Sequence, residues 1–164
     1  ETWIPALLEE DLAALTVHLR TRNEMSDVSA HWELAPSIIE LRDRYAPKTL
    51  ILGNGDLETL EIARAKIKET GIDGAMIGRG VFGNPWFFSG HTPTMIERLA
   101  KLMEHAELFE KMFNGIKPFD IMRKHFKAYT TGFLGAKELR ILLMKTETAA
   151  EVRTITEKFI KSKY

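Results

Sequence analysis

The sequence has 164 residues, of which 45% are hydrophobic and 28% are charged, and this composition excludes the disordered and collagen-like classes. It contains no cysteine, which excludes a disulfide framework, a thiolate metal site and a thiol nucleophile within these residues. Neither an apolar run of roughly eighteen residues nor a basic-then-apolar leader at the start is present. We therefore expect no membrane-spanning segment, no signal peptide and a cytoplasmic location.

The formal net charge of the whole chain is zero, but positive and negative residues are unevenly distributed between its two parts. Residues 117–164 hold 11 Lys and Arg against 5 Asp and Glu, whereas residues 1–116 hold 12 against 18. A positive carboxyl-terminal third suggests a polyanion partner, because Lys and Arg neutralise phosphates. The alternative is a solvated helical face without a partner.

The first half of the sequence alternates between helix-period and strand-like segments. Apolar residues recur at helix spacing in residues 4–14, 36–45 and 57–70, the last followed by Gly71 as a C-cap. Short apolar runs predict strands at residues 15–19, 49–52 and 73–78. A polar loop, Arg20–Ala30, follows the first strand.

This alternation predicts parallel strands joined by right-handed crossovers. Three strands cannot close a barrel, and an eight-stranded (β/α)8 barrel takes about 250 residues. We therefore expect either a fragment that lacks the first five strands of such a barrel or a partner chain that completes the sheet.

The sequence becomes wholly helical after a breaker stretch at residues 89–93. Helix periodicity marks residues 96–112, 118–129, 136–145 and 148–161. We predict two domains, an α/β part over residues 1–90 and an all-α bundle over residues 91–164.

Two strand ends stop at glycines beside one polar or charged side chain. The first reads Asn54-Gly55-Asp56 and the second Gly78-Arg79-Gly80. Glycine lets a ligand approach the backbone, and a guanidinium suits a phosphate, so the pair predicts a phosphate-binding mouth. For the first motif the alternative is an ordinary turn with Asp56 as a helix N-cap.

The string Gly78–Gly83 also matches a dinucleotide-binding G-x-G-x-x-G pattern. We reject that interpretation because Pro85 and Pro93 forbid the long helix that should follow directly. No strand that ends in an acidic residue appears about twenty positions later either.

His18, Arg20 and Arg22 lie at the end of the first strand and in the loop after it. Position alone points the His18 side chain into the same mouth, where an imidazole could bind a ligand, although a strand-end histidine is more often structural. The two arginines could hold a second, phosphorylated ligand, but loop arginines are usually only solvated.

The helical part carries a basic cluster with aromatic residues between its members. The basic cluster consists of Arg123, Lys124, His125, Lys127, Lys137 and Arg140. We expect Met122, Phe126, Tyr129 and Phe133 to be core rather than base-stacking platforms, which leaves the basic side chains free for phosphates. No Ser-His-Asp arrangement, metal-ligand histidine pair or catalytic carboxylate pair is evident.

Four strings, taken in order, resemble the C-terminal half of tRNA-dihydrouridine synthases. They are ALTVHLRTR, LILGNGDLET, DGAMIGRGVFGNPWFF and MRKHFKAYTTGFLGAKELR. The resemblance implies an FMN-bearing (β/α)8 TIM barrel followed by a helical tRNA-binding domain. It also implies reduction of uridine in tRNA to 5,6-dihydrouridine, with NADPH as the electron donor.

The resemblance also implies roles for residues at matching positions. His18 would lie against the flavin, Asn54, Gly55 and Asp56 would surround its phosphate and ribityl chain, and Gly78 with Arg79 would complete the phosphate cradle. Arg20 and Arg22 would face the tRNA. The tRNA would also be contacted by Arg123, Lys124, Lys127 and Arg140.

The family's proton-donating cysteine, its flavin-contacting lysine and its first flavin-binding loop belong to earlier strands. Because this chain has three predicted strands and no cysteine, we predict that by itself it neither closes a barrel nor catalyses the reaction. Two alternatives remain open: an RNA-binding module on a barrel scaffold without catalysis, and another FMN barrel acting on small pyrimidines, such as a dihydroorotate or dihydropyrimidine dehydrogenase.

Overall fold

The structure is a computed structural model, and it describes residues 3–163. The chain folds into two compact units, the first extending to Val81 and the second beginning at Phe82. Each unit has a hydrophobic core of its own.

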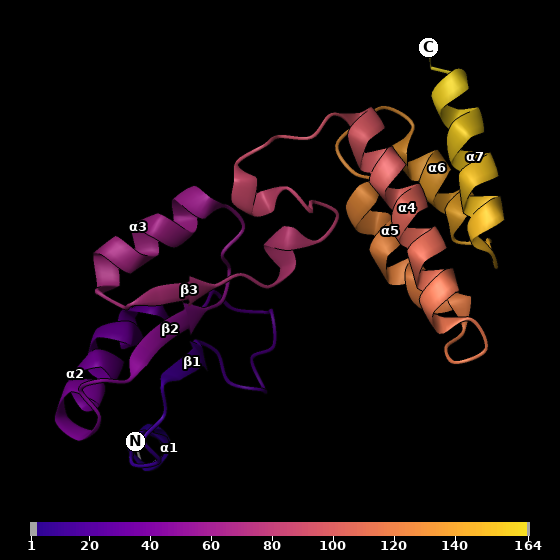
Figure 1. Cartoon of the computed structure of the whole chain (residues 1–164). Coiled ribbons are helices and arrows are strands. Elements are labelled where there is room, and N and C mark those ends of the chain that lie inside the picture. Colours follow the sequence, from indigo (N-terminus) through magenta and orange to yellow (C-terminus); the bar gives the residue numbers. More distant parts are fainter. Residues whose placement is uncertain (1–2, 164) are drawn as a thin grey trace. The chain divides into compact units, whose positions relative to one another are not determined.

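The first unit contains a three-stranded parallel sheet (Figure 1). Its strands lie in the order β1 (Ala14–His18), β2 (Leu50–Asn54) and β3 (Gly74–Met76). His18 lies opposite Asn54, which in turn lies opposite Met76. The carboxyl ends of all three strands therefore meet at one edge of the sheet.

One face of this sheet is packed and the other is partly open. The unit's helices are α1 (Trp3–Leu8), α2 (Ala35–Tyr45) and α3 (Leu60–Thr70). Ile51 of β2 is buried in one cluster with Ile38 of α2 and Ala63 of α3. Leu50 and Met76, which alternation places on the opposite face, are about half exposed.

The predicted strands and helices of this unit are present, with shifted ends. The first helix ends at Leu8 rather than at residue 14, and β1 begins at Ala14. α3 begins later than predicted, since the N-cap is Thr59, whose hydroxyl accepts a hydrogen bond from Ile62 N. Gly71 ends α3 in the left-handed conformation, as the sequence predicts.

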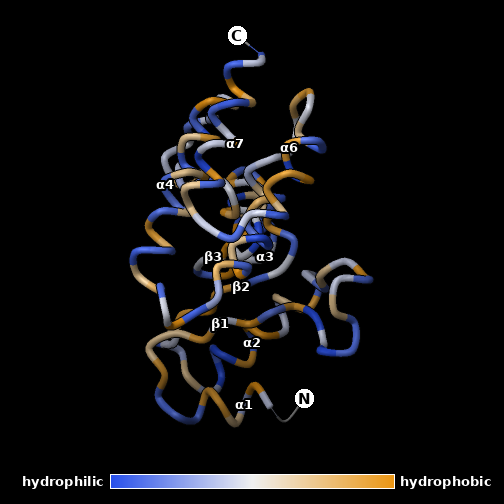
Figure 2. The backbone as a smooth tube through the Cα atoms, turned by 90° about the vertical axis from the view of Figure 1, so that its right-hand side faces the viewer, coloured by the Kyte–Doolittle hydropathy of each residue, from blue (hydrophilic) through white to orange (hydrophobic). Residues whose placement is uncertain are grey.

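The second unit is helical. Its helices are α4 (Met95–Phe113), α5 (Arg123–Tyr129), α6 (Ala136–Leu143) and α7 (Ala149–Lys161). Hydrophilic and hydrophobic stretches alternate along α4 and α7 in Figure 2, as the predicted periodicity requires. Leu102, Phe126, Leu139 and Val152 bring one residue from each helix into the buried core.

Two predicted boundaries in this part differ from the structure. The helix expected over residues 118–129 is a 3-10 turn at Phe119–Met122 that leads into α5. Residues 82–90, assigned from the sequence to the α/β part, pack with the helices instead: Phe82 lies against His125, and a Cβ on Gly83 would meet the Ala128 backbone at 2.6 Å. The breaker stretch at residues 89–93 therefore precedes helix α4 but does not mark the boundary between the two units, which lies before Phe82.

Among residues 3–163, no helix combines the length and apolar character that crossing a membrane requires.

Candidate functional site

A cavity of about 580 Å³ opens at the carboxyl ends of the three strands. The structure brings all six residues predicted for cofactor binding to its wall: His18, Asn54, Gly55, Asp56, Gly78 and Arg79. The remaining lining residues are Arg20, Ser26, Leu57, Glu58 and Gly80. All belong to the first unit, and the loop after each strand contributes at least one.

The strand ends are fixed to one another at this edge. Asn54 Nδ2 donates to the Met76 carbonyl at 2.7 Å, and Leu19 N donates to the Asn54 carbonyl at 3.0 Å. His18 closes β1 with an exposed side chain. The edge is therefore ordered by the Asn54 side chain and by main-chain hydrogen bonds, which leave the imidazole of His18 available to a ligand.

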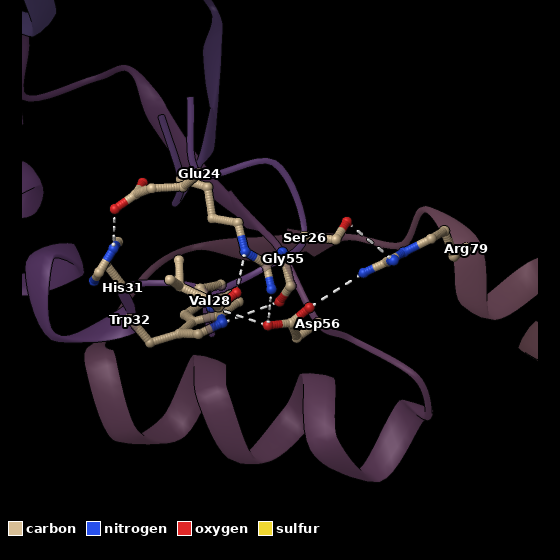
Figure 3. A network of polar contacts seen from close by, with 10 residues as sticks. Glu24, Ser26, Val28, His31, Trp32, Gly55, Asp56 and Arg79 are labelled. Carbon is tan, nitrogen blue, oxygen red and sulfur yellow. Dashed lines mark hydrogen bonds and ion pairs between the residues drawn. The ribbon is translucent and has the colours of Figure 1, made fainter. Parts of the chain in front are cut away.

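Asp56 is the centre of the polar network in Figure 3. Its Oδ2 accepts hydrogen bonds from the Arg20 guanidinium and from Ala30 N, the latter at 2.9 Å, and its Oδ1 lies 3.3 Å from Arg79 Nη2. The bond from Arg20, more than that from Ala30, holds the pKa of this carboxyl below its usual range. Asp56 is also not the N-cap of α3, because Thr59 takes that place.

The two loop arginines have different environments. The Arg20 side chain is only 4% exposed; it pairs with Asp56, and its Nε donates to the Val28 carbonyl at 2.7 Å. This differs from the expectation that Arg20 faces tRNA, since its Nε and Nη2 donate inside the protein and the side chain is nearly buried. Arg22 is exposed, and its contact with tRNA stays a prediction.

Arg79 is the loosely held cation of the cavity. Its side chain is 67% exposed, and it contacts Asp56 Oδ1 and Ser26 Oγ, both at 3.3 Å. These distances lie at the long end for hydrogen bonds. An anion entering the cavity can therefore take up the Arg79 guanidinium without breaking the tighter bond between Arg20 and Asp56.

The sequence reasoning missed the contacts that hold the loop between β1 and α2. Trp32 Nε1 donates to the Gly55 carbonyl at 3.0 Å, and His31 contacts Glu24 (Figure 3). The other ring nitrogen of His31 lies 2.9 Å from Glu33 Oε1. A bond from Thr21 N and one with His31 lower the pKa of Glu24 to about 2, and the bond with Glu24 raises the pKa of His31. Acidic, histidine and tryptophan residues clustered in one polar loop were the only available signal.

The basic residues predicted to meet tRNA lie in the helical unit with different degrees of exposure. Lys124 and Lys127 on α5 are exposed, whereas Arg123 and Arg140 are half-buried. Arg140 Nη2 also donates to the Thr130 carbonyl at 3.1 Å, so this arginine has a structural contact.

The prediction that the interleaved apolar residues are core is confirmed. Met122, Phe126 and Tyr129 are buried, and Phe133 packs against them.

A histidine pair in the same unit was not predicted. The rings of His105 and His125 lie 4.9 Å apart, and His105 Nδ1 is 3.2 Å from the Tyr129 hydroxyl. Burial lowers the pKa of both histidines and raises that of Tyr129. These neutral groups form a polar contact between α4 and α5.

Comparison with known proteins gives consistent matches. The family model described as dihydrouridine synthase (Dus) matches residues 4–163. A probable tRNA-dihydrouridine synthase of Staphylococcus aureus (strain Mu50 / ATCC 700699) is 44% identical over 160 residues, which are 96% of this chain and 49% of that protein. For the probable tRNA-dihydrouridine synthase 2 of Bacillus subtilis (strain 168), the identity is 41% over the same shares.

The chain thus spans about half the length of the curated relatives that it matches. The family model covers nearly all of the chain, and the four strings noted in the sequence fall inside the matched range. This chain belongs to the dihydrouridine synthase family.

Proposed function

We propose that this chain is the carboxyl-terminal half of an FMN-dependent tRNA-dihydrouridine synthase, which reduces uridine in tRNA to 5,6-dihydrouridine with NADPH as electron donor. The observation that carries the proposal is the cavity whose wall contains His18, Asn54, Gly55, Gly78 and Arg79. In parallel α/β folds, ligands bind outside the carboxyl ends of the strands, where this cavity lies.

The proposed whole protein is a (β/α)8 barrel to which this chain contributes the last three strands. The half-exposed apolar side chains of Leu50 and Met76 support this, because the interior of a closed barrel is filled by such side chains. The relatives are twice as long as this chain, which leaves room for five further strands. The helical unit is the proposed tRNA-binding domain.

The residues of the cavity fit a flavin phosphate. Arg79 offers an exposed guanidinium, and a Cβ on Gly78 would meet only the Asn54 amide nitrogen, at 3.9 Å, so a ligand can approach the backbone there. We assign Asp56 an indirect role, because a carboxylate repels a phosphate: it orients Arg20 and Arg79. His18 would contact the bound flavin.

Bound FMN would supply hydride transfer to the pyrimidine ring. This chain supplies binding and orientation, whereas the proton donor must come from elsewhere, since the sequence has no cysteine. We therefore expect the isolated chain to be inactive.

The proposed substrate contacts are the exposed Lys124, Lys127 and Arg22 and the half-buried Arg123 and Arg140. Lys124 and Lys127 would meet tRNA phosphates together with Arg123 and Arg140, and Arg22 would contact the RNA near the cavity. The target uridine must leave its stack to reach the cavity, at a cost of a few kcal/mol that such contacts offset. A tRNA substrate also suggests a cytoplasmic protein.

The test is flavin binding by the full-length protein that contains this chain. We expect the purified protein to show a flavin absorption spectrum and Arg79→Ala to weaken FMN binding about tenfold to hundredfold, since hydrogen bonds to charged groups contribute about 1.5–3 kcal/mol. Arg64→Ala, which removes an exposed arginine on α3, is the matched control and should leave FMN affinity unchanged.

Three results would change the assignment. A wild-type protein without flavin that binds tRNA would be an RNA-binding module. A flavoprotein that reduces free pyrimidines but not tRNA would be a small-molecule oxidoreductase. If Arg79→Ala bound FMN as tightly as wild type, Arg79 would not contact the flavin phosphate.

A further inference from the structure

The loop between β1 and α2 is fastened to the cavity at its base. Arg20, at its beginning, and Ala30 N, at its end, both donate to Asp56 Oδ2. His31 N also donates to the Leu19 carbonyl at 2.7 Å, which closes the two ends of the loop on each other.

Glu24 makes a second connection, higher in the loop. One of its carboxylate oxygens accepts bonds from Thr21 N at 2.7 Å and from Thr21 Oγ1 at 2.9 Å. Its other oxygen lies 2.9 Å from His31 Nε2. Glu24 thereby joins the segment before the tip of the loop to the segment after it.

The geometry requires His31 to be the charged imidazolium in this arrangement. Its two ring nitrogens each lie 2.9 Å from a carboxylate oxygen, of Glu24 and of Glu33 respectively. Ionised carboxylates only accept hydrogen bonds, so both nitrogens must carry a proton. The bond from its own main chain and the bond with His31 lower the pKa of Glu33, and the charge of Lys66 on α3 adds a smaller effect in the same direction. We call Glu24, His31 and Glu33 the loop clasp.

The loop clasp leaves the tip of the loop exposed beside the cavity. Arg22 and Val28 are exposed, and Met25 is 71% exposed in a left-handed conformation, with φ of 47°. Ser26 lines the cavity and lies 3.3 Å from Arg79. A cation and two apolar side chains are thus exposed on a loop that reaches the cavity wall at Ser26 and whose base and middle are both held by hydrogen bonds.

We propose that Glu24 and His31 are positioning residues, which hold this loop in the conformation that presents Arg22 to the RNA substrate. The inference rests on the proposed function for the identity of the substrate. An unrestrained loop of this length would have to be ordered when RNA binds, and the lost conformational freedom would weaken binding. The clasp orders the loop beforehand.

The first experiment measures the loop without substrate. Trypsin cleavage after Arg22 in the full-length native protein, followed by mass spectrometry, should be about tenfold faster in Glu24→Ala than in wild type. His91→Gln is the matched control, because it removes another exposed histidine–carboxylate contact, that with Glu97 at 3.1 Å, and should leave this cleavage unchanged.

The second experiment measures presentation of Arg22. Glu24→Ala should weaken tRNA binding about fivefold and raise the KM for tRNA similarly, with kcat and FMN content unchanged. In an Arg22→Ala background, Glu24→Ala should have no further effect on tRNA affinity, because the clasp acts through that arginine. Additive losses, or cleavage as slow as in wild type, would overturn the proposal.

The dependence of the KM for tRNA on pH shows whether His31 positions the loop or only stabilises the fold. Because the pKa of His31 is raised, the clasp is complete below the ordinary histidine pKa and is lost as pH rises through the higher folded value. The KM for tRNA should therefore rise on the alkaline side in wild type. His31→Arg, which keeps the positive charge and donors, should retain the low KM without this step, and a step that persists there would contradict the proposal.

These results are independent of the flavin. If the wild-type protein held no FMN and formed no dihydrouridine, the proposed function would fall, but cleavage after Arg22 and tRNA affinity would still decide whether the clasp positions Arg22.

Discussion

An aspartate–arginine pair lies at each end of the central strand, and the two pairs are built differently. At the amino end, Asp73 Oδ2 accepts from Ile51 N at 2.7 Å and from Arg42 Nη1 at 2.8 Å, and the same Arg42 nitrogen donates to the Thr49 carbonyl at 3.0 Å. At the carboxyl end, one oxygen of Asp56 holds Arg20, and its other oxygen is left to Arg79.

We infer that the pair at the amino end serves stability and the pair at the carboxyl end serves the proposed ligand binding. The contacts of Arg42 and Asp73 tie strand ends and turns to one another, away from the cavity. The pair at the carboxyl end faces the cavity and keeps a loosely held cation within reach of a ligand. In barrel folds the amino-terminal face of the strands serves stability and the carboxyl-terminal face carries the active site. In the proposed barrel, the two pairs would follow that division.

The largest effect is expected from Asp56→Ala. This change leaves the nearly buried Arg20 guanidinium without its carboxylate, and the free energy of unfolding of the full-length protein should fall by about 2 kcal/mol, less than for a fully buried pair because Asp56 is partly exposed. Urea denaturation measures it. Adding Arg20→Met, which removes the stranded charge, should restore most of the loss, and a double variant as unstable as the single one would contradict this account.

The residues around the cavity could be predicted because strand ends are local features of a sequence. Asn54, Gly55, Gly78 and Arg79 follow apolar runs that stop at glycines, and parallel strands end on one edge of a sheet. The register that places His18 opposite Asn54 follows from the same rule.

The partners of these residues could not be predicted in the same way. Arg20 and Arg22 stand two positions apart, and nothing local shows that one is buried and the other exposed. The reason is a turn at Leu19, where Arg20 N donates to the His18 carbonyl at 2.9 Å and the strand alternation ends. The carboxylate of Asp56, which then meets Arg20, is 36 residues away.

At the amino end of the sheet, Arg42→Ala should reduce stability without affecting the cavity. Asp73 keeps the bond from Ile51 N, but the Thr49 carbonyl and the carboxylates of Asp73 and the exposed Asp43 each lose a donor, so the free energy of unfolding should fall by about 1 kcal/mol. FMN affinity, measured by titration of the flavin-depleted protein, should remain within about twofold of wild type. If Arg42→Ala weakened FMN binding as much as is expected for Arg79→Ala, the amino end would also affect binding, and the two ends of the sheet would not have separate roles.

The smallest effect concerns acid pH, to which both ends should respond in the same direction. The bond from Ile51 N, with Arg42, lowers the pKa of Asp73, as the bond from Arg20 lowers that of Asp56. A lowered pKa in the folded state means that the stabilisation is present above the ordinary aspartate value of about 4 and is lost as pH falls through the folded value. Asp73→Asn keeps an oxygen acceptor for Ile51 N but does not titrate, so its urea midpoint should depend less steeply on pH below about 4 than that of wild type. If the urea midpoint of Asp73→Asn depended on pH as steeply as that of wild type, protonation of Asp73 would not contribute to the loss of stability in acid.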